Sequence, residues 1–171
     1  RAATFNVNHR YMADELLYLL TDSEAKAVIV NSAYAPNLAE ILPQLPNIKL
    51  IIQVPDTSNN ELLEGAIYYN DFIQGHDARD LDDCSPDDLY VLYTGGTTGM
   101  PKGVLWRNAD FFVGALGGLN RKENCEYESY AEVAEAAGRG TLRWMTSAPF
   151  MHGAAQWIAL QALSMGHTVV L

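Results

Sequence analysis

Residues Leu92–Val104 (LYTGGTTGMPKGV) bring together groups that suit the binding of a polyphosphate. The stretch holds four glycines, three threonines and one lysine between two apolar runs. Glycines let backbone N–H groups approach an anion and permit positive φ, and successive N–H groups form concave anion sites. Threonine hydroxyls can donate to phosphate oxygens or ligate a hard cation, and Lys102 adds a mobile positive charge. We therefore expect residues 93–104 to form a phosphate loop, with Gly95–Lys102 separating two strands.

The well-known phosphate-loop patterns do not describe this stretch. The GxxxxGK[ST] pattern fails because Pro101 precedes Lys102, and GxGxxG is absent. On composition alone, a flexible Gly/Thr hairpin without a ligand remains the alternative.

His152 is the second residue with a candidate chemical role. It follows Phe150 and Met151 and precedes an apolar helical pattern. From position alone, a structural histidine is the alternative interpretation. Trp157, about one turn later, suits either the core or the wall of a pocket. The sequence has no GxSxG or HExxH motif, so a serine hydrolase or a zinc protease has no support.

Composition restricts the class of protein. The 171 residues suffice for one domain with a core, and 49% apolar with 19% charged residues is ordinary for a globular protein. A formal charge of −10 argues against nucleic acid as a partner. No apolar run reaches the length of a membrane span, and no signal peptide is recognisable. Cys84 and Cys125 are far apart, which favours free thiols in the cytoplasm.

The pattern of apolar residues predicts alternating strands and helices. Such alternation indicates an α/β fold with a layered, mostly parallel, Rossmann-like sheet flanked by helices. The expected strands are Ala3–Val7, Lys26–Val30, Lys49–Val54, Leu89–Thr94, Gly103–Trp106, Leu142–Pro149 and His167–Leu171. The expected helices are Ala13–Ser23, Ala33–Leu45, Asn108–Leu119 with Asn108 as cap, Glu128–Gly138 and Gly153–Gly166.

Residues 55–88 differ in texture from the rest of the chain. The part that runs from Gly75 to Leu89 carries six aspartates. We expect a solvated acidic connector here, because the spacing of a calcium-binding loop is absent.

The order of residues in the Gly/Thr stretch resembles the signature of the acyl-adenylate-forming superfamily, Y-T-S/G-G-T-T-G-x-P-K-G-V. Tyr93–Val104 match it, with Gly95 where serine is commonest, a choice familiar among fatty acyl-CoA ligases. Two further segments, FNVNHRYMADELLYLLTDSEAKAVI and TSAPFMHGAAQW, resemble the upstream segment and the later acyl-pocket motif. The resemblance therefore covers residues 1–171 and identifies the chain as part of the large N-terminal domain of such an enzyme.

The resemblance implies an acid–thiol ligase with ATP, Mg²⁺ and CoA. A carboxylic acid attacks ATP to give an acyl-adenylate and pyrophosphate, and the CoA thiol then displaces AMP. The residues expected to hold the nucleotide phosphates are Thr94, Gly95, Gly96, Thr97, Thr98, Gly99 and Lys102. Thr98 would also lie near Mg²⁺, and His152 would gate the acyl tunnel as the catalytic candidate.

The family's Y-G-x-T-E and Y-x-T-G-D motifs do not occur in the chain. We therefore expect an internal fragment that is inactive alone, from a cytoplasmic enzyme or one peripheral to a membrane through a fatty substrate. Two alternatives stay open. One is the adenylation domain of a peptide synthetase, and the other is a phosphate-binding or interaction module without chemistry.

Overall fold

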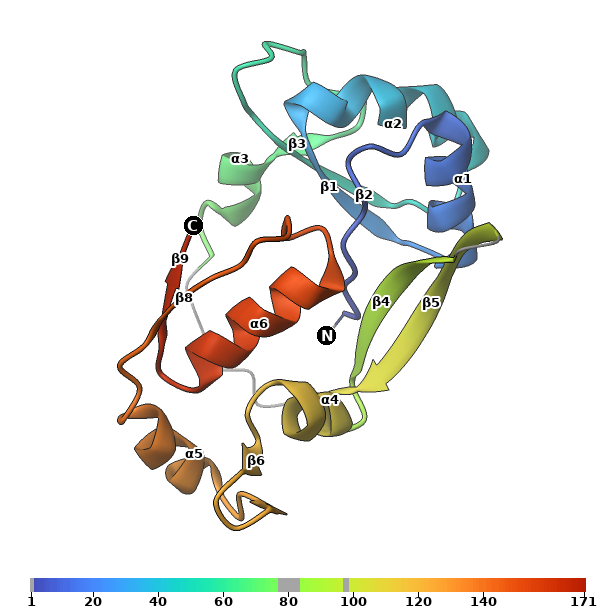
Figure 1. The fold of residues 1–171 in the computed structure, drawn as a ribbon. Coiled ribbons are helices and arrows are strands. Elements are labelled where there is room, and N and C mark those ends of the chain that lie inside the picture. The colour runs from blue at the N-terminus through green and yellow to red at the C-terminus, as the bar shows by residue number, and fades with distance from the viewer. Residues whose placement is uncertain (1, 77–83, 97–98) are drawn as a thin grey trace. The chain divides into compact units, whose positions relative to one another are not determined.

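A computed structural model describes residues 2–76, 84–96 and 99–171 (Figure 1). The chain forms two compact units, with residues 9–80 in one and residues 1–8 and 81–171 in the other. We call them unit 2 and unit 1, respectively.

Unit 2 contains a parallel sheet with the strand order β1-β2-β3. Ala27 to Asn31 of β1 pair in parallel with Leu50 to Val54 of β2. The intervening helix returns the chain to the same end of the sheet, as a parallel connection requires. The elements are α1 (Ala13–Asp22), β1 (Ala27–Asn31), η1 (Ser32–Tyr34), α2 (Ala35–Ile41), η2 (Leu42–Gln44), β2 (Leu50–Val54), β3 (Ile67–Tyr68) and α3 (Tyr69–Ile73).

The core of unit 2 comes from the apolar positions of these elements. Acidic residues occupy the first turn of α1, where they complement the helix dipole, and Glu15 accepts a hydrogen bond from the Met12 N–H. The buried side chains include Leu19, Leu20, Leu38, Ile41, Ile51 and Ile52. The predicted helices and strands around α1, β1, α2 and β2 are therefore confirmed, although Leu42–Gln44 form a 3₁₀ turn rather than α-helix.

A buried polar network closes the carboxyl end of β1 and β2. Gln53 is 0% exposed, and its Nε2 donates to Ser32 Oγ at 3.0 Å and to the Glu61 carbonyl at 2.9 Å. Its Oε1 accepts from the Leu63 N–H at 3.0 Å. Ser32 Oγ donates in turn to the Val54 carbonyl at 3.2 Å. We call this set the Gln53 network; it fastens the segment after β2 to the sheet.

Residues 55–88 contain more structure than the expected connector. Strand β3 pairs in parallel with β2 through Ile52–Ile67 and Gln53–Tyr68, and α3 follows directly. Two residues of strand are too short to give a periodic signal in the sequence. The aspartates at positions 77–83 lie outside the described residues.

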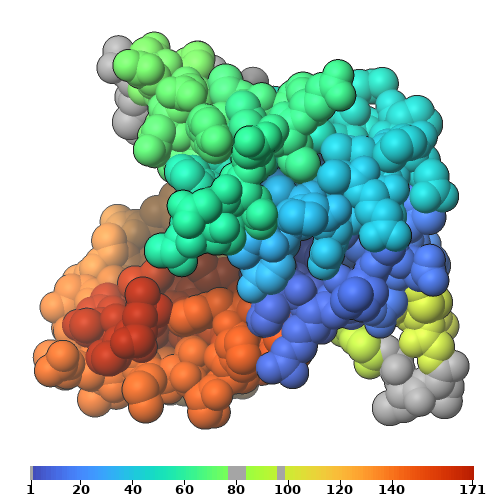
Figure 2. Space-filling view, turned by 90° about the horizontal axis from the view of Figure 1, so that it is seen from above, coloured from blue at the N-terminus to red at the C-terminus, as the bar shows by residue number. Residues whose placement is uncertain are grey.

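Unit 1 begins with an antiparallel hairpin of β4 (Leu89–Gly96) and β5 (Gly99–Arg107). The expected strands were shorter, because six of the eight residues that were to separate them belong to β4 or β5. Thr94 lies opposite Lys102, and Gly96 lies opposite Gly99 after a register shift. The described residues next to this turn, Gly95, Gly99 and Met100, are exposed. Figure 2 shows atoms of this part of the hairpin in yellow-green on the face in view.

The middle of unit 1 is built from short elements. They are α4 (Asn108–Ala115), β6 (Leu119–Asn120), β7 (Cys125–Glu126) and α5 (Tyr130–Ala137). Asn108 is the first helical residue and not the cap, which is Arg107 without a side-chain cap bond. Ser129 caps α5 by accepting from the Glu132 N–H, and Gly138 ends the helix as predicted. The antiparallel pair β6–β7 was not predicted.

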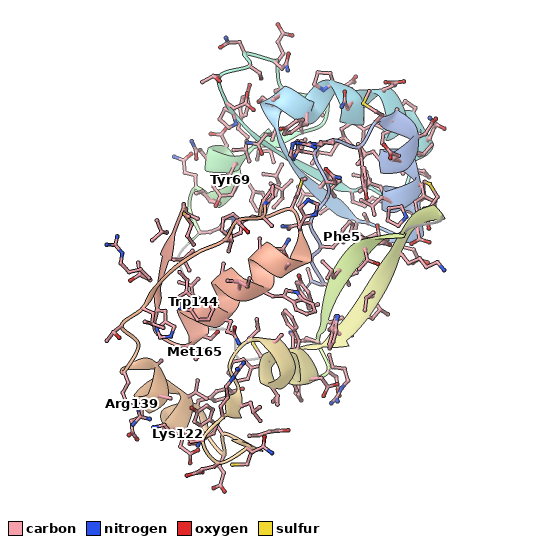
Figure 3. All side chains as sticks on the ribbon, in the orientation of Figure 1. Phe5, Tyr69, Lys122, Arg139, Trp144 and Met165 are labelled. Carbon is pink, nitrogen blue, oxygen red and sulfur yellow. The ribbon has the colours of Figure 1, made fainter. Side chains whose placement is uncertain are left out.

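The last part of unit 1 is a parallel strand–helix–strand unit of β8 (Arg143–Met145), α6 (Gly153–Ser164) and β9 (Thr168–Val170). Trp144 and Met165 are labelled near the C-terminal end of α6 in Figure 3. The Trp144 ring stacks on His167 at 5.4 Å. Gly166 has φ +72° and a Cβ there would meet the Ala137 carbonyl oxygen, so only glycine fits between α6 and α5.

The expected class, α/β with parallel sheet and flanking helices, is confirmed. One expected strand is absent, because residues 2–8 carry no regular secondary structure. This segment is held by side chains instead, since Phe5 contacts Tyr93 and Asn6 donates to the Phe150 carbonyl. Within the described residues, no helix is both long enough and apolar enough to cross a membrane.

Candidate active site

The register of the hairpin assigns its side chains to two faces. In an antiparallel pair, opposed residues point to the same side, and alternate residues along each strand share that side. Thr94 opposes Lys102, Leu92 opposes Val104, and Tyr90 opposes Trp106. These six residues define one face, which we call the Lys102 face.

Helix α6 packs on the Lys102 face. Tyr90 Oη donates to Gln156 Oε1 at 2.9 Å, and the Trp106 and Trp157 rings meet edge to face at 5.5 Å. At the start of the helix, a Cβ on Gly153 would lie 2.6 Å from Cδ2 of Leu92. Glycine therefore lets the first turn of α6 approach β4 beside Leu92.

This contact fixes the start of α6 beside β4. His152 immediately precedes Gly153 and is the N-cap residue of α6. Thr94 and Lys102 occupy the next position along the Lys102 face after Leu92 and Val104. His152 is therefore adjacent in sequence to the residue that packs on Leu92, and Leu92 lies one position from the Thr94–Lys102 pair on that face. His152 is exposed, as an approach by substrate requires.

The charge of Lys102 is available to a ligand. Within the described part of the chain, its ammonium group has no ion pair, and Thr94 is exposed beside it without a side-chain hydrogen bond. The other end of the hairpin differs. There Arg107 pairs with Asp87 at 2.7 Å and Asp110 at 3.2 Å. The hydrogen bond that Arg107 donates to Asp87, together with the charges of Asp110 and Asp87, raises the pKa of Arg107.

The glycines of the loop leave space rather than adopt left-handed backbone. A Cβ at Gly95 or Gly99 would meet nothing within 4 Å, and neither has a positive φ. The positive φ that glycine permits is therefore not used at these two positions. Gly103 has a different reason, because a Cβ there would lie 3.1 Å from the ring of Tyr93. Tyr93 is itself covered by Phe5, labelled beside β4 in Figure 3.

The predicted site residues fall into three groups. Thr94, Gly95 and Gly96 end β4, and Gly99 and Lys102 lie in β5. His152 comes from α6, as described above. Thr97 and Thr98, including the expected ligand of Mg²⁺, lie outside the described residues.

No cluster of three or more His, Cys, Asp or Glu suited to a metal occurs in the described ranges. A magnesium ion that is coordinated by nucleotide phosphates needs only one or two protein ligands. This finding therefore concerns only metal sites in which the protein supplies most of the ligands.

Sequence reasoning missed Asn6, Tyr90 and Gln156. Gln156 Nε2 donates to the Phe150 carbonyl at 2.7 Å, and Asn6 Nδ2 donates to the same oxygen at 3.0 Å. One signal was present, because Gln156 is the single polar side chain among the first seven residues of α6. The partners of Asn6 and Tyr90 are distant in sequence and left no such signal.

Comparison with known families now identifies the class of protein. The profile of the AMP-binding enzyme family matches residues 1–171. The chain belongs to the AMP-binding enzyme family.

Individual relatives refine this result. The chain is 51% identical over 174 residues to "Medium-chain acyl-CoA ligase Mig" of Mycobacterium avium. The alignment covers 99% of this chain and 31% of that protein. The chain is 37% identical to "3-oxocholest-4-en-26-oate--CoA ligase" of Rhodococcus rhodochrous, over 100% of this chain and 31% of the relative. The chain thus spans about a third of the curated relatives that it matches.

Solved structures support the fold. The anthranilate CoA ligase AuaEII in complex with anthranoyl-AMP gives a TM-score of 0.73 at 20% identity, with 99% of this chain and 30% of that chain covered. ATP-bound MatB from Rhodopseudomonas palustris gives 0.69 at 18% identity, with 99% and 30% covered. At these identities the likeness shows the fold alone.

Proposed function

We propose that the chain supplies the phosphate-binding part of an ATP-dependent acyl-CoA ligase acting on a medium-chain or related carboxylic acid. The observation that carries this proposal is the packing of Gly153, the residue after His152, on Leu92, which lies next to the Thr94–Lys102 pair on the Lys102 face. The family membership and the 51% identity to a medium-chain acyl-CoA ligase support it.

The proposed chemistry has two half-reactions. In the first, a carboxylate oxygen of the acid bonds to the α-phosphorus of ATP, and the bond from that phosphorus to the bridging oxygen breaks, so pyrophosphate leaves. In the second, the CoA thiol loses its proton, sulfur bonds to the acyl carbon, and the bond to AMP breaks. Both reactants of the first step are anionic, so charge stabilisation is the main catalytic demand.

The residues of the hairpin would meet this demand. Lys102 would place its ammonium group on the outer phosphates, and the Thr94 hydroxyl would donate to a phosphate oxygen. Backbone N–H groups at Gly95, Gly96 and Gly99 can approach closely because no Cβ intervenes. Thr97 and Thr98 would add hydroxyls, and Thr98 would be the protein ligand of Mg²⁺. When bound, Mg²⁺ supplies charge neutralisation on the phosphates.

His152 would serve the acid and not the nucleotide. It is the N-cap residue of α6, and the next residue, Gly153, packs against Leu92 of β4, two residues before Thr94. Backbone N–H groups at a helix N-terminus also favour a carboxylate nearby. We propose that His152 contacts the acyl carboxylate and gates the acyl tunnel in the enzyme, which we place in the cytoplasm.

Acid-dependent exchange of labelled pyrophosphate into ATP tests the proposal, measured on the full-length ligase that carries this chain. We expect exchange with fatty acids and thioester formation on addition of CoA. Exchange with amino acids instead would favour a peptide-synthetase adenylation domain. Binding of ATP without exchange for any acid would favour a non-catalytic phosphate-binding module. The 171-residue chain alone should give no exchange, because the remaining family motifs are not in it.

A further inference from the structure

The carbonyl of Phe150, two residues before His152, is held by two amide side chains. Gln156 Nε2 donates to it at 2.7 Å from the first turns of α6. Asn6 Nδ2 donates at 3.0 Å from the N-terminal segment. The two donors come from opposite ends of the sequence, so this oxygen is a fixed point of unit 1.

The direction of each hydrogen bond in this group follows from its chemistry. An indole N–H can only donate, and Trp157 Nε1 donates to Tyr90 Oη at 3.3 Å. The Tyr90 hydroxyl proton is then directed to Gln156 Oε1 at 2.9 Å. Gln156 must therefore present its NH₂ group to the Phe150 carbonyl, and the orientation of its amide is determined by the chain of donors.

Aromatic packing holds the Tyr90 hydroxyl in place. Its ring stacks on Phe111 at 4.3 Å with an interplanar angle of 3°. Trp157 meets Phe111 at 5.2 Å and Trp106 at 5.5 Å, both edge to face. Phe111 is 3% exposed, so this cluster is part of the core of unit 1. Such rings have few rotamers open to them when buried.

The backbone around His152 is fixed by further bonds. The His152 N–H donates to the Pro149 carbonyl at 3.0 Å, and its own carbonyl accepts from Ala155 at 3.1 Å and from Gln156 at 3.3 Å. Together with the hydrogen bond from Gln156 to the Phe150 carbonyl, these bonds fix the backbone conformation of the turn that carries His152. The same Gln156 is bonded to Tyr90 of β4, the strand that continues to Thr94.

We infer that Gln156 is a positioning residue: with Tyr90, it sets where His152 stands relative to the Thr94–Lys102 pair, and so controls how the carboxylate substrate is held. This inference rests on the proposed function. Gln156 touches neither substrate, and the acid site should depend on it far more than the nucleotide site does.

The test uses three variants of the full-length ligase. Gln156→Met keeps the length of the side chain and removes both hydrogen bonds. Tyr90→Phe keeps the stacking on Phe111 and removes the hydroxyl that orients Gln156. Gln161→Met is the matched control, with the same change on the same helix at a residue whose side chain has no hydrogen bond among the described residues.

For Gln156→Met we expect the KM of the acid to rise about five- to twentyfold, with the KM of ATP within about twofold of wild type, because both hydrogen bonds of the Gln156 side chain are lost. Tyr90→Phe should change the acid KM in the same direction by about two- to fivefold. Gln161→Met should change neither constant. Gln156→Glu should behave like Gln156→Met, because a carboxylate can accept from Tyr90 but cannot donate to the Phe150 carbonyl.

Two results would overturn the inference. One is an acid KM that is unchanged in Gln156→Met while His152→Ala raises it, which would leave the proposed function standing. The other is an equal loss for acid and ATP that follows a lower melting temperature in both Gln156→Met and Tyr90→Phe. If His152→Ala and Lys102→Ala also leave both KM values unchanged, the proposed function itself is wrong.

Discussion

The β1-β2-β3 sheet of unit 2 and the β4-β5 hairpin of unit 1 differ in whether the polar side chains at their ends are already hydrogen-bonded. In unit 2, the carboxyl end of β1 and β2 is closed by the Gln53 network. Each polar atom of the Gln53 amide bonds to Ser32 or to the backbone of Glu61 and Leu63. In unit 1, the end of the hairpin presents Thr94 and Lys102, both exposed and without side-chain partners among the described residues.

This difference separates a structural polar site from a candidate binding site. Parallel α/β sheets commonly bind ligands at the carboxyl end of their strands. Unit 2 has such an end, but its polar groups are already satisfied and buried, so a ligand would have to break them. The rule does not cover the hairpin, whose strands are antiparallel. The hairpin nevertheless offers the charge of Lys102, which has no ion pair among the described residues, and glycines at which a ligand can approach the backbone. Hydrogen-bond satisfaction therefore favours the hairpin as the candidate site, whereas the sheet type alone would favour unit 2.

The largest effect on stability is expected in the Gln53 network, to which the comparison assigns a purely structural role. Gln53→Leu should lower the free energy of unfolding by about 3 kcal/mol or more, because Ser32, Glu61 and Leu63 each lose a buried partner. Urea denaturation of the 171-residue chain measures this. Gln44→Leu, at an exposed residue of η2, is the control and should stay within about 0.5 kcal/mol. Equal losses of unfolding free energy in Gln53→Leu and Gln44→Leu would mean that the Gln53 network does not stabilise unit 2.

Lys102→Ala tests the other side of the comparison. Loss of one charge-assisted contact with phosphate should cost about 1.5–3 kcal/mol, or about ten- to a hundredfold in the KM of ATP or the rate of adenylation. The unfolding free energy should hardly change, because Lys102 is exposed. Lys122→Ala, at the turn between β6 and β7 labelled in Figure 3, is the matched control. An unchanged dependence on ATP would place Lys102 outside the site.

His152→Ala should give a smaller and more selective effect. We expect the KM of the acid to rise about three- to tenfold and the preference for chain length to change, with less effect on ATP. Steady-state kinetics with short, medium and long acids measure both. His76→Ala, at an exposed residue after α3, serves as control. A uniform loss for every acid, in step with a lower melting temperature, would mean that His152 is structural.

The smallest effect is a pH dependence in unit 2. Hydrogen bonds from the Ser58 side chain and from the backbone of Ala33 and Ser58 lower the pKa of Asp56 in the folded chain. Because this pKa is lowered by folding, ionised Asp56 stabilises the fold at pH values above the ordinary pKa of aspartate. That stabilisation is lost as pH falls through the pKa of Asp56 in the folded chain. Wild type should therefore be slightly more stable than Asp56→Asn at pH 6, and the difference should shrink as pH falls below about 4, the ordinary pKa of an aspartate. A difference that is as large at pH 2.5 as at pH 6 would assign the effect to shape rather than charge.

The sequence predicted those elements whose apolar pattern is long. The helices α1 and α6 and the strands β1 and β2 lie within two or three residues of their expected positions. The Gly/Thr/Lys stretch was located because its chemistry is local. Periodicity could not show that β4 and β5 pair with each other, so the loop was expected to be longer than the described pairing allows.

The remaining features depend on long-range contacts. Ala3–Val7 has the composition of a strand, but Phe5 packs against the ring of Tyr93 and Asn6 donates to the Phe150 carbonyl, and the segment pairs with no strand among the described residues. The two-residue strands β3, β6 and β7 are set by their partners and have no pattern of their own. The approach of the start of α6 to β4 requires Gly153 to fit against Leu92, a fact of packing that no motif states.

The placement of the tryptophans makes the site observable without a label. Of the three in the chain, Trp106 and Trp157 meet at 5.5 Å with an interplanar angle of 88°, and Trp106 lies on the Lys102 face. Two indoles at this separation couple their electronic transitions, so the pair should give a distinct near-ultraviolet circular dichroism signal. Trp144 lies apart from this pair, stacked on His167. Intrinsic optical spectra of the chain can therefore report the seating of α6 on the hairpin as phosphate ligands are titrated.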